Sequence, residues 1–210
     1  MANDTFFETE AGDSGQENAI PYMQEVTGSY ASLNPSTDMI IRWASCKWGL
    51  DENSMRAEAV IESGWHQIDN FGDASSSECT AGGGVSLIGL AGASPGGREC
   101  WRSFGLYQIM VVVPNYNAWD GAWKATAFNA DYRAAFQRAC MDGTIAGYMQ
   151  GQGASQYAAY TNPANAANTD YMFWGCMGEW YSGYWYDSGA KNYISQVQQA
   201  LSSKAWIGLQ

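Results

Sequence analysis

The chain has 210 residues, of which 46% are hydrophobic and 14% aromatic, including ten Trp and thirteen Tyr. This is enough apolar material for one domain with a real core. The net charge of −11 argues against binding to nucleic acid or docking on an anionic membrane, because both need clustered Lys and Arg.

The chain divides into an arm and one domain. Residues 1–35 show no hydrophobic period and are predicted to form an irregular N-terminal arm. Residues 36–210 are predicted to form a single, mainly helical domain. Residues 72–97 within it are rich in Gly, Ser and Ala, which predicts a loop or a short irregular hairpin region.

Helical periods of apolar residues predict the main elements of this domain. The first two helices are predicted in "NPSTDMIIRWASCKWG" and "LDENSMRAEAVIESG", which Gly49 and Gly64 can end. Further helices are predicted in "TAFNADYRAAFQRACMDG" and "AKNYISQVQQALSSKAW". Residues 144–170 are predicted to hold a short helix and a loop, and the following "GCMGEWYSGYWYDSG" is aromatic and interrupted by glycine.

Five widely spaced cysteines indicate disulfides of an exported protein rather than a metal site. None forms a Cys-x-x-Cys pair and there is a single histidine, so we expect neither metal nor cofactor. We predict the pairs Cys79–Cys100 and Cys140–Cys176, with Cys46 free on a helix.

The N-terminus is polar and acidic, without the features of a signal peptide, and no apolar run is long enough to span a bilayer. The chain is therefore either cytosolic or the mature form of a secreted protein. The cysteines favour secretion.

Glu62 stands at the end of the second predicted helix, in "ESGW". A carboxyl that lies beside aromatic rings, out of bulk water, has a raised pKa and can serve as a general acid near neutral pH. On spacing alone, Glu58 is an equal candidate one turn earlier, and a solvated surface glutamate is the commoner situation.

The order of motifs favours Glu62. "ESGW", then "SFGLYQIM" at residues 103–110, then "WYSG" at 180–183 and "YISQV" at 193–197 resembles the soluble lytic transglycosylases of the lysozyme-like superfamily. It is similar, more distantly, to the goose-type lysozymes. The resemblance covers roughly residues 38–200 and extends to a secreted, actinobacterial-type branch. It implies an α+β lysozyme-like fold and a catalytic domain over residues 36–210.

The resemblance also implies roles for individual residues. Glu62 corresponds to the catalytic acid/base, and Ser103 to a serine near the cleaved bond. Gln108 corresponds to a glutamine that lines the cleft, and its neighbour Tyr107 is expected to contact substrate. Tyr193 corresponds to the tyrosine whose hydroxyl holds the catalytic carboxyl.

Aromatic side chains are expected to form walls of the sugar site, because rings stack on the C–H faces of sugars. The candidates are Trp65, Trp180 and Tyr181. Trp180 and Tyr181 stand where the family carries Tyr-Asn of a Tyr-Asn-Ala-Gly motif. The missing asparagine leaves the substrate open.

A second carboxylate would decide between two reaction types. Working alone, Glu62 would cleave by the anhydro-forming route of the family, whereas a carboxylate across the cleft, about 6.5–9.5 Å away, would activate water. Asp73 is our preferred candidate, with Asp69 and Asp131 as alternatives, and an Asx-turn role for Asp73 is equally plausible.

Three hypotheses for the function remain. The first is a monomeric enzyme that cleaves β-1,4 linkages of peptidoglycan. The second is an enzyme of the same fold acting on another polysaccharide, such as chitin. The third is a non-catalytic glycan-binding protein.

Overall fold

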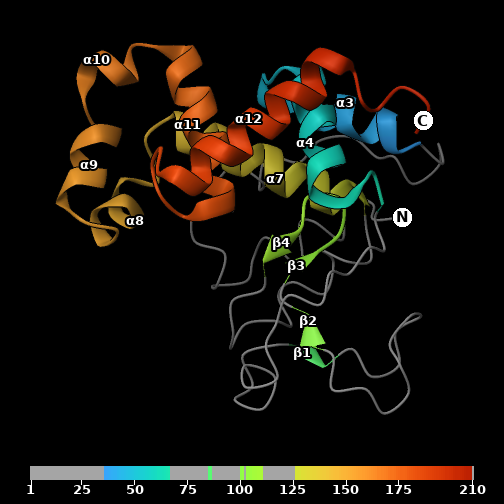
Figure 1. The fold of residues 1–210 in the computed structure, drawn as a ribbon, viewed down its shortest axis with the longest axis horizontal. Helices are drawn as coiled ribbons and strands as arrows, with labels where there is room; N and C mark the ends of the chain where they lie inside the picture. The colour runs from blue at the N-terminus through green and yellow to red at the C-terminus, as the bar shows by residue number, and fades with distance from the viewer. Residues whose placement is uncertain (1–35, 67–84, 87–99, 102, 111–125, 210) are drawn as a thin grey trace.

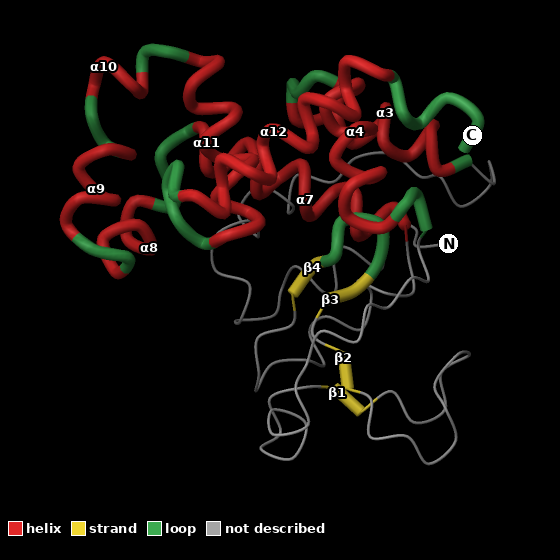
Figure 2. Tube along the Cα trace, viewed as in Figure 1, coloured by secondary structure: helices red, strands yellow, loops and turns green. Residues whose placement is uncertain are grey.

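The computed structural model describes residues 36–66, 85–86, 100–101, 103–110 and 126–209. This part of the chain is mainly helical (Figures 1 and 2), as the hydrophobic periods predict. The predicted arm at residues 1–35 lies outside the described residues, and so does most of the Gly-rich region at 72–97.

The helices and strands follow in chain order. The helices are α3 (Thr37–Trp48), α4 (Glu52–Ser63), α7 (Thr126–Met141), α8 (Ala146–Gly151), α9 (Ala154–Tyr160), α10 (Pro163–Ala166), α11 (Thr169–Ser182) and α12 (Ser188–Ser203). The strands are β1 (Val85–Ser86), β2 (Cys100–Trp101), β3 (Ser103–Phe104) and β4 (Ile109–Met110). β1 pairs antiparallel with β2, and β3 with β4.

Helices α3 and α4 end at the glycines that their sequences predict. The side chains of Ser36 and Asp51 each accept a hydrogen bond from a backbone N–H of the first turn. Gly49 and Gly64 end the two helices with φ of 64° and 61°, a left-handed conformation that glycine adopts without steric cost. The stop at Gly64 places Glu62 in the last turn of α4.

Five helices share the main hydrophobic core. α4 packs against α12, α3 against α7, and α11 against both α7 and α12. A smaller buried cluster lies where α8 and α9 meet the ends of α7 and α11. In Figure 1, α8, α9 and α10 form a lobe to the left of α11. None of the helices in the described ranges has the length and apolar character needed to cross a bilayer.

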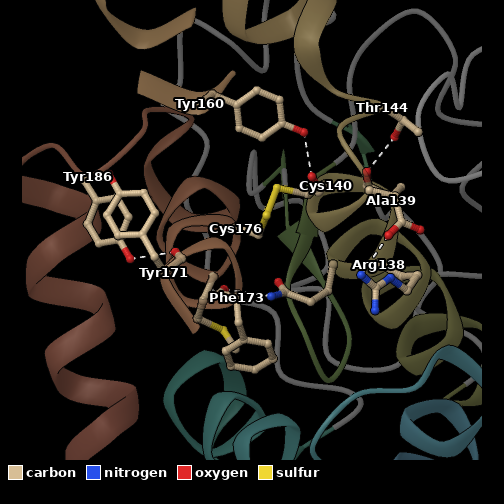
Figure 3. Close-up of a disulfide and its surroundings, with 12 residues drawn as sticks. Arg138, Ala139, Cys140, Thr144, Tyr160, Tyr171, Phe173, Cys176 and Tyr186 are labelled. Carbon is tan, nitrogen blue, oxygen red and sulfur yellow. Dashed lines mark hydrogen bonds and ion pairs between the residues drawn. A yellow bond between two sulfur atoms is a disulfide. The ribbon is translucent and has the colours of Figure 1, made fainter. Parts of the chain in front are cut away.

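The predicted disulfide Cys140–Cys176 is confirmed and joins α7 to α11 (Figure 3). The hydroxyl of Tyr160 donates to the Cys140 carbonyl at 2.6 Å, which ties α9 to the same point. Cys46 is free and exposed on α3, as predicted. The other predicted pair includes Cys79, which lies outside the described residues.

Two regions are more helical than their sequences predict. Residues 144–170 hold the three short helices α8, α9 and α10 instead of one, and α11 includes the first part of the glycine-interrupted aromatic segment, up to Ser182. The glycines in α11 are packing positions: a Cβ at Gly178 would lie 2.8 Å from the Ala190 Cβ of α12, and one at Gly175 would lie 2.3 Å from the Trp185 ring. They permit close approach and do not break the helix.

Gly178→Ala is therefore expected to destabilise the protein by about 1–3 kcal/mol, because the added methyl overpacks the contact between α11 and α12. Gly147→Ala in α8 is the matched control, since a Cβ there has nothing within 4 Å, and should be neutral or slightly stabilising. Urea denaturation of both variants measures the difference. Equal stability of the two would contradict this account of the helix contact.

Candidate active site

The "SFGLYQIM" segment forms a tight hairpin that lies against the end of α4. Strands β3 and β4 are joined by a turn at residues 105–108. Within this turn the Leu106 carbonyl accepts a hydrogen bond from Ser63 Oγ at 2.9 Å, and the Tyr107 backbone N–H donates to Asn129 Oδ1 at 2.6 Å. These bonds hold the turn between α4 and α7, beside the residue that follows Glu62.

Glu62 lies half-buried and is held by a side chain of α12. The hydroxyl of Tyr193 donates a hydrogen bond to Glu62 Oε1. Burial raises the pKa of Glu62 to about 8, and the nearby carboxylate of Glu58 adds to this rise, whereas hydrogen bonds from Tyr193 and Trp180 oppose it. The carboxyl is therefore protonated at neutral pH, as a general acid must be.

Glu58 and Glu62, which helical spacing made equal candidates for the general acid, have different surroundings. Glu58 has no exposed surface, and its Oε1 forms an ion pair with Arg133 Nε at 2.7 Å. Glu62 is half-buried and keeps contact with solvent. Of the two, only Glu62 can reach a ligand that approaches from outside.

Two aromatic residues of α11 lie next to this carboxyl. Tyr181 is 59% exposed and stacks on the Tyr193 ring with centroids 4.7 Å apart and planes 6° apart. Trp180 is half-buried, with the Arg133 guanidinium 4.7 Å from the centre of its ring. The fold thus brings "ESGW", "WYSG" and "YISQV" together around Glu62.

Two of the aromatic residues expected to contact substrate are buried instead. Tyr107 has no exposed surface, and its hydroxyl donates to the Met55 carbonyl at 3.0 Å, so the ring packs beneath the turn. Trp65 is 8% exposed and belongs to the main core, with a φ of 76°. Both rings are buried in this structure, and whether either of them faces a ligand stays a prediction.

The remaining polar candidates are spread around the turn. Ser103 is half-buried on β3. Gln108 is half-buried with a φ of 48°, and its Nε2 donates to the Gly105 carbonyl at 2.9 Å. Whether these two side chains touch a substrate stays a prediction.

The second carboxylate also stays a prediction. Asp131 is buried and forms an ion pair with Lys47 at 2.7 Å, while it accepts a hydrogen bond from the Trp48 indole, so it is committed to α3. Asp69 and Asp73 lie outside the described residues.

Sequence reasoning missed two buried charged residues near the site. Arg133 on α7 has no exposed surface, and Glu179 on α11 is 3% exposed. Burial raises the pKa of Glu179 to about 7, against the opposing charge of Arg133. The spacing of Arg133 gives no sign of burial, because α7 is enclosed on nearly every side, including the positions that would form its polar face. Glu179 ends a run of buried residues in α11 that begins at Gly175.

Within the described ranges, no cluster of three or more His, Cys, Asp or Glu residues could hold a metal ion. Comparisons with protein-family models, curated proteins and solved structures find no match for this chain.

Glu62→Gln is expected to change how stability depends on pH. In the folded state the pKa of Glu62 is about 8 instead of 4.5, so folding retains a proton that the unfolded chain releases. The stability that this group contributes is fully present below about pH 4.5 and is lost as pH rises through about 8. The variant should therefore gain about 1–3 kcal/mol relative to the wild type between pH 4 and pH 9.

Chemical denaturation of both proteins at pH 4 and pH 9 measures this change. The comparison at pH 4 is the internal control, because both side chains are uncharged there. A stability difference that is the same at both pH values would contradict a raised pKa at Glu62.

Proposed function

We propose that the protein is a glycan-cleaving enzyme that acts on β-1,4 linkages of peptidoglycan, with Glu62 as its general acid/base. The observation that carries the proposal is the half-buried Glu62 carboxyl, whose pKa is raised to about 8 and which accepts a hydrogen bond from Tyr193. Its position next to the 105–108 turn agrees with the order of motifs in the sequence.

The proposed reaction uses both protonation states of Glu62. The protonated carboxyl donates its proton to the glycosidic oxygen as the C–O bond breaks, and the N-acetyl group of the muramic unit stabilises the cation at C1. The carboxylate then takes the proton of the 6-hydroxyl, whose oxygen closes an anhydro ring on C1, and Glu62 is protonated again. Water in place of the 6-hydroxyl would give hydrolysis.

The aromatic surface beside Glu62 supports a sugar as the ligand. Tyr181 presents most of its ring to solvent, and its stacking on Tyr193 fixes the orientation of the ring. A ring held in this way offers a flat apolar face for the C–H groups of a sugar, with a hydroxyl at its edge for hydrogen bonding.

The disulfide Cys140–Cys176 supports a secreted protein, because such bonds persist in oxidising compartments. We expect the enzyme to act as a monomer on cell-wall glycan outside the cell that makes it.

Glu62→Gln should lower the rate of peptidoglycan cleavage by about 10²–10⁴-fold, because the amide cannot donate the required proton. The matched control is Glu52→Gln, the same change on the same helix at a side chain that is 44% exposed, which should leave the rate unchanged. Equal rates for wild type and Glu62→Gln would overturn the proposal.

Mass spectrometry of the digested cell wall identifies the reaction. Anhydromuramic ends indicate lytic cleavage, and hydrated reducing ends indicate a muramidase. Because Tyr181 stands where the family carries asparagine, the experiment should be repeated with chitin oligosaccharides in place of peptidoglycan. Glu62-dependent cleavage of chitin alone would identify the second candidate function, an enzyme for another polysaccharide.

A further inference from the structure

A series of hydrogen-bonded side chains runs from Glu62 into the core. The hydroxyl of Tyr193 lies within hydrogen-bond distance of two carboxylates: it bonds to Glu62 Oε1, and it lies 3.4 Å from Glu58 Oε1. That same Oε1 of Glu58 accepts from Arg133 Nε at 2.7 Å. Glu62 is therefore connected through one hydroxyl to an ion pair with no exposed surface.

Carboxyl groups outnumber positively charged groups in this region. Three buried or half-buried carboxyls, those of Glu58, Glu62 and Glu179, lie around one buried guanidinium, that of Arg133. Burial raises the pKa of Glu58, and the ion pair with Arg133 opposes that rise. Because the guanidinium keeps its charge at every physiological pH, the carboxyl in direct contact with it holds the negative charge. Glu62, whose pKa is about 8, is then mostly protonated at neutral pH, and Glu179, whose pKa is about 7, is partly protonated.

A tyrosine hydroxyl carries one hydrogen and can accept others, so Tyr193 can serve both protonation states of Glu62. When Glu62 is protonated, it can also donate to the Tyr193 oxygen, which frees the Tyr193 hydrogen to point to the Glu58 carboxylate. When Glu62 has lost its proton, the Tyr193 hydrogen rotates back to Glu62. Glu58 supplies the alternative acceptor that makes the first arrangement possible.

Charged and titratable groups from each helix packed here, and from the hairpin turn, face the hydrogen-bonded series Glu62–Tyr193–Glu58–Arg133. On α4 these are Glu58 and Arg56, on α7 Arg133, on α11 Trp180 and Glu179, on α12 Tyr193, and in the hairpin turn Tyr107. Arg56 is engaged by Asp38 at 2.6 Å, and Tyr107 donates to a backbone carbonyl. Besides burial, the groups that shift the pKa of Glu62 most are Glu58, Tyr193, Arg133 and Trp180.

We infer that Glu58, fixed by Arg133, is a positioning residue that keeps Glu62 protonated and oriented through the Tyr193 hydroxyl. This inference rests on the proposed function for its purpose, but the predicted coupling between the two carboxyls can be measured without any substrate. The inference gives a role to Glu58, which is fully buried and contacts neither solvent nor a bound glycan.

The test is a carbon-13 NMR titration of the Glu62 side-chain carboxyl. In Glu58→Gln the pKa of Glu62 should fall by at least about one pH unit, because the neighbouring negative charge is removed and Arg133 is left free to attract Glu62. In Tyr193→Phe the pKa should rise instead, because the carboxylate loses a hydrogen-bond donor. A general disturbance of packing would not move the two variants in opposite directions.

Glu179→Gln is the matched control, since it makes the same chemical change at another buried carboxyl and should shift the pKa of Glu62 less than Glu58→Gln does, because Glu58 shares the Tyr193 hydroxyl with Glu62. An unchanged pKa in folded Glu58→Gln would overturn the inference. So would an equal fall in Glu58→Gln and Glu179→Gln.

Glu58→Gln leaves Arg133 without its carboxylate and can prevent folding, since breaking a buried pair is costly. The double variant Glu58→Gln with Arg133→Met removes both charges and keeps the volume filled. Its Glu62 pKa should still fall, by less than in the single variant, because Glu58 raises that pKa more than Arg133 lowers it. A pKa at or above the wild-type value in the double variant would also overturn the inference.

Activity provides a separate readout. If the wild type cleaves peptidoglycan, the basic limb of its pH–rate profile should move to lower pH in the double variant, by the shift that NMR measures. Failure of the wild type to cleave any glycan would remove the proposed function while leaving the titration result intact. A pH–rate profile that does not move although the pKa does would show that Glu58 has no role in the reaction.

Discussion

The ion pair between Glu58 and Arg133 is the contact on which the centre of the molecule depends. It joins α4 to α7 inside the core. Helix α12 reaches it through the Tyr193 hydroxyl, and α11 through the ring of Trp180, which lies over the guanidinium. Since a buried charge without its partner is strongly unfavourable, these four helices can assemble in few other ways. The pair thus acts as a specificity constraint on packing as well as a local bond.

The same region holds polar atoms at an energetic disadvantage. Five buried side-chain atoms of the described residues have no hydrogen-bond partner, and three of them lie here: Glu58 Oε2, Arg133 Nη1 and Glu179 Oε2. Each such atom costs about 1–3 kcal/mol, and an apolar core of equal volume would avoid that cost. Natural proteins accept costs of this kind mostly where chemistry needs them. The concentration of these atoms behind Glu62 agrees with a site that depends on unusual protonation.

The sequence was informative where local chemistry decides the structure. The stops at Gly49 and Gly64 follow from a rule that acts over a few residues. The pair Cys140–Cys176 was one choice among several possible pairings, because cysteine positions indicate disulfides without fixing which residues join. Helix α11 was missed because Gly175 and Gly178 usually interrupt helices, and only the positions of Trp185 and Ala190 explain them. The burial of Tyr107 could not be predicted for a related reason: its hydroxyl bonds to the carbonyl of Met55, fifty-two residues earlier in the chain. Glu58 and Arg133 are seventy-five residues apart, and no local pattern records that they meet.

Two residues that flank the site adopt a backbone conformation that glycine would hold more easily. Trp65 and Gln108 have φ of 76° and 48°, and each costs on the order of 1 kcal/mol relative to glycine there. At Trp65 that cost is outweighed by burial of the ring, because removing a large side chain from a core costs about 3–5 kcal/mol. Selection for thermal stability alone would therefore favour glycine at Gln108 and keep tryptophan at 65. A laboratory evolution experiment that rewards only heat resistance should drift toward glycine at 108, whereas one that also rewards the proposed glycan cleavage should retain Gln108. Position 108 would then record, in a population of sequences, how strongly that side chain is needed.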